Sequence, residues 1–457
     1  MKEFLNILSS IIWSPALVAL LLGAGIYFSV RTRFVQFRKL KRMIGLLKET
    51  EDKGKAGISS FHAFCLSLSG RVGTGNIVGV ATAIAVGGPG AVFWMWIVAF
   101  LGASTAFVES TLSQLFRFKH DGMWRGGPAV YIKEGLHCKW LAVVFAVATL
   151  IGSGICSTTV QTNGMALALN NTFNVDLVWG GISMAVLVSI VIIGGSRFLV
   201  KVSGIVTPFM AIAYMAVALI VIAFNWRGVL PALGAIVTNA FGIKPLVAGI
   251  MGSTISMGVK RGLFSNEAGQ GIGAIPSASA ESEHPVDQGL VQALTVFVDT
   301  ILVCTATALM ILTTNSFNIV DPQNSTLLLS NAPELGNNYV GYTQAAVSTV
   351  FGNFGNAFVS IELVFFVFTT MMAYYFYAES SIMFLFKDSE KKKTEKLMMN
   401  LFKVLFLAAI IYGAVKESDY VWALADIGVG VMAWINVICI LLLSPHVFRS
   451  LKDYESR

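Results

Sequence analysis

The sequence predicts an all-α integral membrane protein with about eleven transmembrane helices. Of its 457 residues, 55% are hydrophobic and only 12% are charged, about half the charged share of an ordinary soluble domain. A soluble fold of this length would lack enough polar side chains to cover its surface. In addition, the chain contains a succession of apolar segments of about 20 residues, the length that crosses the hydrocarbon core of a bilayer.

Each apolar segment is taken as one expected span. The first is too long for the apolar part of a signal peptide and lacks a clear small-residue cleavage site, so we expect it to be retained. Residues 228–245 are less apolar and predict a short amphipathic surface helix outside the membrane. The expected spans lie near residues 10–30, 60–86, 91–116, 140–169, 178–194, 202–224, 246–280, 290–314, 355–386, 398–415 and 419–443.

The basic residues predict the orientation of the chain. Of 32 Lys and Arg residues, 25 fall in alternate loops and the C-terminal tail, four fall on the other side, and three lie inside apolar segments. Because basic loops stay in the cytoplasm, we expect an external N-terminus and a cytoplasmic C-terminus. We also expect the chain to cross the plasma membrane, of the bacterial inner-membrane type, many times. The net charge of +7 reflects these loops and does not indicate a nucleic-acid partner.

Two expected spans share an unusual interruption. The first reads SLSGRVGTGNIVGVATAIAVGGPGA and the second STISMGVKRGLFSNEAGQGIGAIPSASA, each with glycines among polar residues at its centre. Without the first span, the remaining ten form two sets of five, and each set begins with one of these segments. The predicted orientation makes the two sets inverted repeats. The expected units are 1–59 (first span and basic cytoplasmic segment), 60–227 (first repeat, broken at 70–76), 228–245 (external segment), 246–443 (second repeat, broken at 262–269) and 444–457 (cytoplasmic tail).

Paired interruptions in inverted halves point to the binding site of a secondary transporter. Unwinding frees main-chain N–H and C=O groups, which membrane helices tolerate only where these groups line a cavity or bind something. The N-terminal ends of half-helices favour a carboxylate, and free carbonyl groups favour a cation. A zwitterionic amino acid with a cotransported Na⁺ suits that set. The alternative is that these glycines form a helix-packing face.

Three segments carry a resemblance to a known family. GTGNIVGVATAIAVGGPGAVFWMW (73–96), RGLFSNEAGQG (261–271) and CSTTVQTNGMALAL (156–169) resemble signatures of the alanine/glycine:cation symporters, also called sodium:alanine symporters. The resemblance extends over essentially the whole chain. It implies a LeuT-type five-plus-five inverted repeat with one extra N-terminal helix.

The same resemblance implies import of a small neutral amino acid coupled to Na⁺ by alternating access. Alanine or glycine is the expected substrate, with serine and glutamine as further candidates. No organic cofactor is expected, and the expected partners are the substrate and the lipid bilayer. Two alternatives remain at this stage: a proton-coupled symporter and a membrane channel. A channel would more often show repeated pore segments or charged rings.

The first interruption supplies candidate ligands for substrate and cation. We expect the N–H groups of Gly73, Thr74 and Gly75 to bind the substrate carboxylate, since glycine lets a ligand approach the backbone. Asn76 resembles the sodium-ligating Asn of LeuT-type transporters; the alternative is a helix-capping Asn.

The second interruption contains Phe264, Ser265, Asn266 and Glu267, all candidates for substrate binding. Phe264 is expected to act as a lid or pocket wall, and Asn266 to contact the substrate or its cation. Glu267 is costly in the membrane unless paired. It is expected either to face the substrate ammonium group or to pair with a neighbouring base, Arg261 or Lys260.

Other spans supply further candidates. By resemblance Gln161 would reach the substrate, while the alternative is an interhelical hydrogen bond. Thr369 and Thr370 resemble the second sodium site of LeuT-type folds, which the main-chain carbonyl groups of Ser69 and Val72 would complete. Alternatively, the threonines bond to their own helix.

Several charged residues inside the spans have open roles. Arg71 precedes the first interruption and is either a gate residue paired with an acid or a contact for a larger substrate such as glutamine. Its candidate partners are Glu109, Glu362 and Glu379. Asp299 and Asp426 could serve proton coupling or act as buried pairing partners. The sequence has no HExxH, G-x-S-x-G or GxxxxGK[ST] motif, so we do not expect an enzyme.

Overall fold

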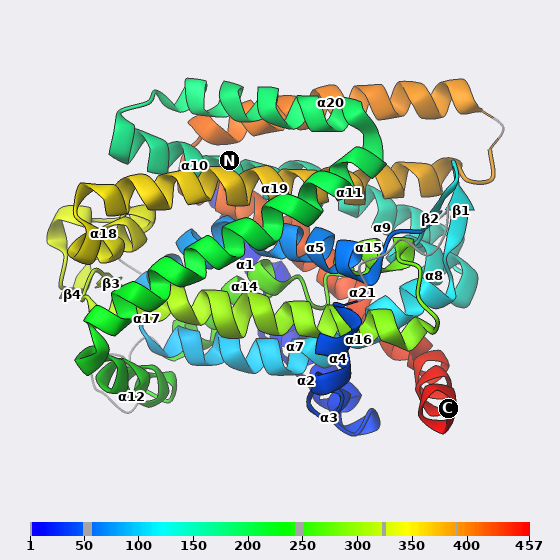
Figure 1. Ribbon diagram of the computed structural model, residues 1–457, viewed down its shortest axis with the longest axis horizontal. Coiled ribbons are helices and arrows are strands. Elements are labelled where there is room, and N and C mark those ends of the chain that lie inside the picture. Colours follow the sequence, from blue (N-terminus) through cyan, green and yellow to red (C-terminus); the bar gives the residue numbers. More distant parts are fainter. Residues whose placement is uncertain (1, 49–56, 243–250, 322–325, 390) are drawn as a thin grey trace.

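The computed structural model describes residues 2–48, 57–242, 251–321, 326–389 and 391–457. Helices dominate this part of the chain, and most of them run along the long axis of the molecule (Figure 1). Among the described residues, eight helical stretches are long and apolar enough to cross a membrane, which confirms an all-α membrane protein. These stretches are Ile7–Arg31, Gly90–Leu115, Lys139–Phe173, Leu177–Phe224, Pro285–Thr313, Asn353–Phe386, Lys392–Val415 and Ser418–Ser456.

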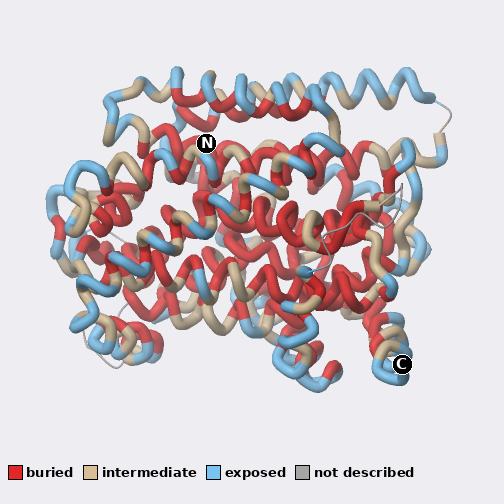
Figure 2. The backbone as a smooth tube through the Cα atoms, in the orientation of Figure 1, coloured by how far each residue is buried: buried red, intermediate tan, exposed pale blue. Residues whose placement is uncertain are grey.

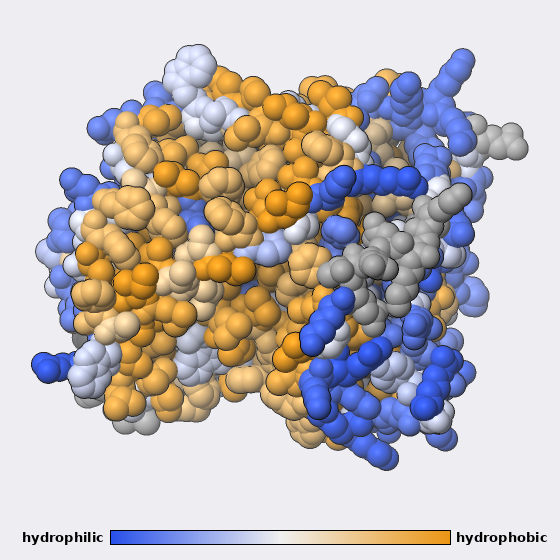
Figure 3. Space-filling model, viewed as in Figure 1, coloured by the Kyte–Doolittle hydropathy of each residue, from blue (hydrophilic) through white to orange (hydrophobic). Residues whose placement is uncertain are grey.

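The surface agrees with a molecule embedded in lipid. Hydrophobic residues cover the middle of the face in Figure 3, and hydrophilic residues gather most densely at the end that carries the C-terminus, α3 and α4. Buried residues fill the interior (Figure 2), and many of them are polar. Since buried polar groups are costly in hydrocarbon unless paired, the polar interior is the part of the fold that needs a functional explanation.

The N-terminal helices pack on the outside of the central bundle. Pro15 occupies the first turn of the second helix, where its missing N–H costs nothing. The first two helices contact α21 and α7, and the fourth contacts α16. Residues 49–56 of the expected basic segment lie outside the described residues. The four helices are α1 (Lys2–Ile12), α2 (Pro15–Arg31), α3 (Val35–Arg38) and α4 (Leu40–Leu46).

The segment expected as the span 60–86 is interrupted near its middle. Its first half, α5 (Ser60–Arg71), begins at Ser59, whose side chain accepts a hydrogen bond from the N–H of His62. The helix ends at Val72, which has extended backbone (φ −78°, ψ 96°). The chain then enters a short π-helix, η1 (Gly75–Gly79), and the helix α6 (Val80–Gly87).

The remaining elements of the first half are long helices and one hairpin. After α7 (Gly90–Leu115), two short antiparallel strands precede another helix. The next helical stretch contains a π-helical turn, a feature often found at functional sites. The elements are β1 (Phe118–His120), β2 (Met123–Arg125), α8 (Pro128–Gly135), α9 (Lys139–Ile151), η2 (Gly152–Ser157) and α10 (Thr158–Phe173).

The two expected spans 178–194 and 202–224 fall within one long helix, α11 (Leu177–Phe224). Gly195 within it is not helical (φ 79°, ψ 173°). This conformation suits glycine, so the chain changes direction between the two expected spans. A 3₁₀ turn, η3 (Trp226–Gly228), and a short helix, α12 (Val229–Ala240), follow in the segment expected at the surface.

The second interrupted segment was expected at 246–280, and its residues 246–250 lie outside the described residues. Helix α14 (Met251–Asn266) ends in mid-segment. Glu267, Gly269 and Gly271 then adopt positive φ values of 57°, 94° and 85°, which cannot continue a right-handed helix. The chain becomes helical again in α15 (Ala274–Ser279).

The rest of the second half again consists of long helices. A π-helical segment lies inside the first of these stretches, and two short antiparallel strands follow it. The elements are α16 (Pro285–Val296), η4 (Phe297–Cys304), α17 (Thr305–Thr313), β3 (Asn318–Val320), β4 (Leu327–Ser330), η5 (Pro333–Leu335), α18 (Tyr339–Phe351), α19 (Asn353–Phe386), α20 (Lys392–Val415) and α21 (Ser418–Ser456).

The helices pack in two groups. In one group, α7 lies against α14, α15 and α16, and α5 lies against α15 and α16. In the other, α10 and α11 lie against α19 and α20. Helix α5 also contacts α11 and α19, so the interrupted segments border both groups. A short parallel bridge between Ile58 and Ala280 joins the start of α5 to the end of α15.

Candidate functional site

The first interruption is held open by side chains. The N–H of Gly73 donates to Asn76 Oδ1 at 2.8 Å, and the N–H of Thr74 donates to Gln161 Oε1 at 2.8 Å. The Thr74 hydroxyl also donates to the main-chain oxygen of Gln161 at 3.1 Å. Two main-chain N–H groups in the middle of this segment therefore donate to amide oxygens of side chains instead of to the helix. The carboxylate of a ligand would offer them the same kind of acceptor.

The glycines of this interruption are needed for close contacts. A Cβ atom on Gly73 would lie 2.7 Å from both Gln161 Oε1 and Thr370 Oγ1. A Cβ atom on Gly75 would lie 3.1 Å from the ring of Phe264, which belongs to the second segment. The backbone of the first interruption is thus approached from three helices, at Gly73 more closely than a Cβ atom allows and at Gly75 more tightly than most Cβ contacts.

The second interruption is closed by its own residues and by η4. Asn266 accepts a hydrogen bond from the N–H of Ala268 at 3.0 Å and donates to the Thr300 hydroxyl at 3.3 Å. Gln270 Nε2 donates to the main-chain oxygen of Leu263 at 2.6 Å. The side chains of Ser265 and Asn266 are fully buried, so the end of α14 lies deep inside the protein.

Asp299 connects the two interruptions. Its carboxylate accepts hydrogen bonds from Asn76 at 2.6 Å, from Ser265 at 2.8 Å and from Thr300 at 2.7 Å. The Cys304 thiol lies 3.3 Å from Asn76 Nδ2 and 3.2 Å from Ser265 Oγ. Asp299 is fully buried in the π-helical segment η4. A buried carboxylate with three donors and no ion pair within 4.0 Å in the described structure is a strong candidate to face a cation.

The two adjacent threonines of α19 have different environments. The Thr370 hydroxyl lies 2.9 Å from the main-chain oxygen of Ser69 and 3.3 Å from that of Val72, both at the first interruption. It also lies 2.8 Å from the main-chain oxygen of Phe366. The Thr369 hydroxyl instead contacts Met210 Sδ at 3.3 Å and the same Phe366 oxygen at 3.0 Å. Only Thr370 meets the freed carbonyl groups.

Aromatic and charged residues cover one side of the interruptions. The rings of Phe264 and Trp422 lie 4.8 Å apart. The guanidinium group of Arg261 lies over the Trp422 ring at 4.1 Å and pairs with Asp426 at 2.8 Å. Arg261 and Asp426 are both buried. Asp426 is the ion partner of Arg261, so Arg261 does not form the pair with Glu267 that was one of the alternatives for this acid.

On the other side, Arg71 lies in a group of buried charges. Its Nη1 donates to the main-chain oxygen of Gln292 at 3.1 Å, while its Nε and Nη2 have no hydrogen-bond partner among the described residues. It attracts Glu109 and Glu267 electrostatically without a direct ion pair to either. Glu379 pairs with Arg125 at 3.0 Å, so Arg71 is not its ion-pair partner. Glu362 is buried on the same helix as Glu379.

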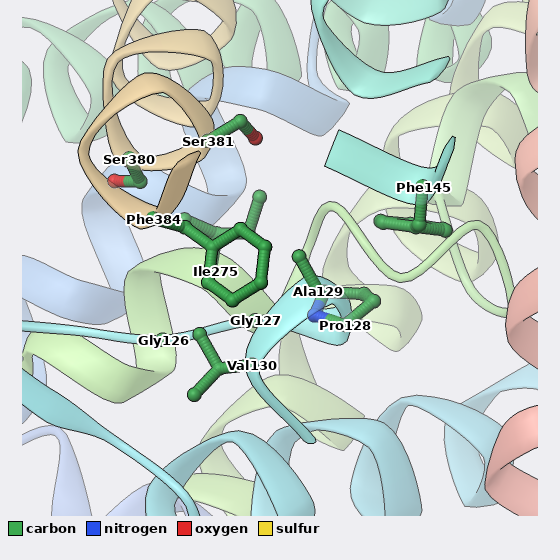
Figure 4. A pocket seen from close by; sticks show the side chains of 10 residues that line it. All are labelled: Gly126, Gly127, Pro128, Ala129, Val130, Phe145, Ile275, Ser380, Ser381 and Phe384. Carbon is green, nitrogen blue, oxygen red and sulfur yellow. The ribbon is translucent and has the colours of Figure 1, made fainter. Parts of the chain in front are cut away.

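A small cavity lies beside α15 (Figure 4). In that view, residues of the loop before α8 and of α8 itself face Ile275 of α15 and the C-terminal part of α19. The cavity therefore borders the second interrupted segment without reaching the interruption. Its lining consists of Gly126, Gly127, Pro128, Ala129, Val130, Phe145, Ile275, Ser380, Ser381 and Phe384.

Sequence reasoning left out several residues that contact these groups. Tyr374 accepts a hydrogen bond from Gln161 at 3.4 Å, and Tyr377 donates one to Glu267 at 3.3 Å. Both follow Thr370 on α19 by one and two helical turns, so they lie on nearly the same face. That spacing was a usable signal. Asp299 contacts residues of both interruptions. The sequence indicated this contact only weakly, through the presence of an acid in the middle of an apolar segment.

These features define a membrane protein of many helices whose buried polar centre lies between two interrupted segments, an arrangement found in secondary transporters. The comparison with known proteins identifies the particular family. The chain belongs to the sodium:alanine symporter family, which it matches over residues 1–457. The protein is therefore a cation-coupled amino acid symporter, and its family consists of transporters rather than enzymes.

Individual relatives are similar over nearly their whole length. A putative sodium/proton-dependent alanine carrier, YrbD of Bacillus subtilis (strain 168), is 46% identical over 456 residues, which cover 100% of this chain and 93% of the relative. A sodium/proton-dependent alanine carrier of Bacillus sp. (strain PS3) is 43% identical, covering 91% of each chain. A probable sodium/glutamine symporter, GlnT of Bacillus subtilis (strain 168), is 39% identical, covering 99% of this chain and 91% of the relative.

Proposed function

We propose that this protein imports a small neutral amino acid together with Na⁺ by alternating access. The observation that carries the proposal is the pair of interruptions, whose free backbone groups and buried side chains meet around Asn76 and Asp299. Such unwound segments are the usual location of substrate and ion sites in secondary transporters. The plasma membrane and the orientation predicted from the basic loops belong to the same proposal.

The first interruption supplies the site for the substrate carboxylate. The amide groups of Gly73 and Thr74 lie at the N-terminal end of the helical stretch that continues through η1 and α6, where the helix dipole favours negative charge. In this structure they bond to the side-chain oxygens of Asn76 and Gln161. An incoming carboxylate would replace the Gln161 oxygen and free that side chain to bind the ligand.

The ends of α5 and α14 supply the complementary site for the ammonium group. Both helices end at an interruption, so the negative ends of their dipoles lie at the same buried centre. The Phe264 ring lies against Gly75 and packs on the ring of Trp422, which leaves little space for a long side chain. This packing favours alanine or glycine over serine, and disfavours glutamine most.

Two groups of oxygen atoms are candidate Na⁺ sites. The first contains the side chain of Asn76 with the carboxylate of Asp299, whose negative charge a cation would balance. The second contains the Thr370 hydroxyl with the main-chain oxygens of Ser69 and Val72. A single hydroxyl hydrogen cannot satisfy these carbonyl groups together, and a hard cation can bind all of the oxygens at once. The Thr369 hydroxyl contacts Met210 and Phe366 instead of these oxygens, so Thr369 is a weaker candidate for a Na⁺ ligand than Thr370.

The arrangement of the helices fits a LeuT-type inverted repeat with one extra N-terminal helix. The first and second helices of each half pack in one group (α5–α6, α7, α14–α15, α16), and later helices of each half pack in the other (α10, α11, α19, α20). We infer that these groups rock against each other. The Phe264–Trp422 contact closes the external path, and the cavity beside α15 lies on the cytoplasmic path.

The test uses the purified protein in proteoliposomes. Uptake of labelled alanine is measured with and without an inward Na⁺ gradient at equal internal and external pH. The proposal predicts saturable uptake that accumulates alanine only when the Na⁺ gradient is present. Gradient-independent, non-saturating flux would instead favour a channel. Labelled glycine, serine and glutamine at the same concentration would rank the substrates.

A further inference from the structure

Residues 33–46, here called the α3–α4 segment, directly follow the first membrane-crossing stretch, which ends at Arg31. The segment carries four large apolar side chains that are 40–52% exposed. A helical segment with exposed apolar side chains at the end of a span suits the boundary between the acyl chains and the headgroups of a bilayer. The four side chains are Phe34, Phe37, Leu40 and Ile44.

Basic side chains without an acidic partner accompany these apolar ones. Arg33 precedes α3, and Lys41 lies in the first turn of α4; both are exposed. The nearby Arg38 pairs with Glu455, whereas neither Arg33 nor Lys41 pairs with an acid among the described residues. The positive charges of Arg33 and Lys41 therefore remain available to an external anion.

This combination of side chains favours one kind of partner. Figure 3 shows hydrophilic residues gathered at the end of the molecule that carries α3 and α4. A bilayer leaflet with anionic headgroups offers negative charge beside an apolar layer, which matches bases interleaved with exposed rings and aliphatic chains. A soluble anion or a nucleic acid would leave the apolar side chains in water.

The other side of α4 attaches the segment to the central bundle. Met43 and Leu46 are fully buried, and α4 packs on α16. Arg42 Nη2 lies 3.2 Å from Asp287 Oδ1 in the first turn of α16. The hydroxyl of Tyr454 in α21 donates to the same Asp287 oxygen at 2.8 Å. The position of α4 is therefore tied to the start of α16.

Helix α16 leads from this attachment to the candidate Na⁺ site. It continues into η4 within one helical stretch, Pro285–Thr313. Asp287 lies near the start of the stretch, and Asp299 lies in η4, where it accepts the hydrogen bond from Asn76. A helix transmits a shift of its end along its axis because its backbone is hydrogen-bonded throughout. Movement of α4 would therefore reach the residues around Asp299.

We propose that the α3–α4 segment binds anionic phospholipid headgroups, and that this contact holds α16 in the position that supports transport. The apolar side chains enter the headgroup boundary, and the charged groups of Arg33 and Lys41 attract the lipid phosphates. This inference rests on the proposed function, including the predicted orientation, and adds a lipid partner that sets the transport rate. It assigns no further ion to the transport cycle.

The experiment compares two kinds of proteoliposome, one of phosphatidylcholine alone and one that also contains phosphatidylglycerol. We expect Na⁺-driven alanine uptake to be at least about threefold faster when the anionic lipid is present. The double variant Arg33→Gln with Lys41→Gln should lose this stimulation but match the unmodified protein in phosphatidylcholine. The control, Lys393→Gln with Lys396→Gln, removes two charges from α20, which packs in the other helix group, and should keep the stimulation.

A binding measurement tests the lipid contact without transport. Added phosphatidylglycerol should raise the melting temperature of the purified protein in detergent more than phosphatidylcholine does, and the Arg33/Lys41 variant should lose the difference. Equal effects of the two lipids, an equal effect of soluble glycerol 3-phosphate, or full stimulation of uptake in the Arg33/Lys41 variant would overturn the inference. Absence of Na⁺-driven uptake in both kinds of vesicle would instead contradict the proposed function, and the melting temperatures would still decide the lipid contact.

Discussion

Asn76 of the first interruption donates a hydrogen bond of 2.6 Å to the carboxylate of Asp299 in η4. The same Asn76 side chain accepts the N–H of Gly73 at 2.8 Å, so it joins the free backbone of one half of the chain to an acid of the other half. Both residues are fully buried. A cation bound between them would balance the charge of Asp299 and also fix Asn76, which holds the backbone of the first interruption. In this way Na⁺ binding would prepare the backbone that binds the amino acid, which couples the two ligands.

Asn76 should therefore affect ion dependence more than substrate affinity. Asn76→Ala removes an oxygen from the candidate Na⁺ site, and we expect the Na⁺ concentration for half-maximal uptake to rise about tenfold, or roughly 1.4 kcal/mol. Gln161→Ala alters the group that faces Thr74 and should mainly raise the KM for alanine. Sodium titrations of initial uptake rates in both variants check this. Equal loss of Na⁺ dependence in the two variants would contradict the assigned roles.

The adjacent threonines of α19 provide a matched pair. Thr370→Val removes the hydroxyl that meets the main-chain oxygens of Ser69 and Val72, and we expect Na⁺-driven uptake to fall at least about tenfold. Thr369→Val removes only contacts to Met210 and to its own helix, so its uptake should stay within about twofold of the unmodified protein. The measurement is alanine accumulation at limiting Na⁺. If uptake fell more in Thr369→Val than in Thr370→Val, the Na⁺ site would not include the Thr370 hydroxyl.

Close packing at Gly73 should make it intolerant of even one methyl group. Gly73→Ala places a Cβ 2.7 Å from Gln161 Oε1 and from Thr370 Oγ1, which forces both groups away from the interruption. We expect alanine binding to weaken by at least about 100-fold, or roughly 2.7 kcal/mol. Gly252→Ala in α14, where a Cβ would meet no atom within 4 Å, is the control and should bind alanine normally.

The buried ion pair between Arg261 and Asp426 should contribute to the stability of the folded protein. Asp426→Asn leaves the Arg261 guanidinium buried without its carboxylate, which costs about 3–5 kcal/mol in comparable buried pairs. We expect a lower melting temperature for the purified protein in detergent. The exchange Arg261→Asp with Asp426→Arg should recover part of the loss, because the opposite charges face each other again. An unchanged melting temperature in Asp426→Asn would show that the pair is weak.

Hydropathy and glycine content were sufficient to predict an all-α membrane protein and to direct attention to two segments of the chain, but the eleven expected spans correspond to eight apolar stretches in the described residues. The family resemblance, carried by residues 73–96, 156–169 and 261–271, is confirmed by the match over the whole chain. These features are local, since each depends on the composition of one segment. Periodicity also explains why Thr369 and Thr370 differ, because neighbouring residues of a helix point about 100° apart.

The partners of the buried charges could not be predicted in the same way. Arg261 pairs with Asp426, 165 positions along the chain, and Glu379 pairs with Arg125. These choices depend on how helices pack, and several acids at similar membrane depth were equally available from sequence alone. The central position of Asp299 likewise arises only because η4 lies against both interruptions.

The central claim is that the two interruptions form one site that binds an amino acid only together with Na⁺. Equilibrium binding of labelled alanine to the purified protein, in Na⁺ and in choline at the same ionic strength, tests it most directly. We predict saturable binding in Na⁺, much weaker binding in choline, and loss of the Na⁺-dependent part in Gly73→Ala. Alanine binding that is equal in the two salts and unchanged in Gly73→Ala would contradict the account.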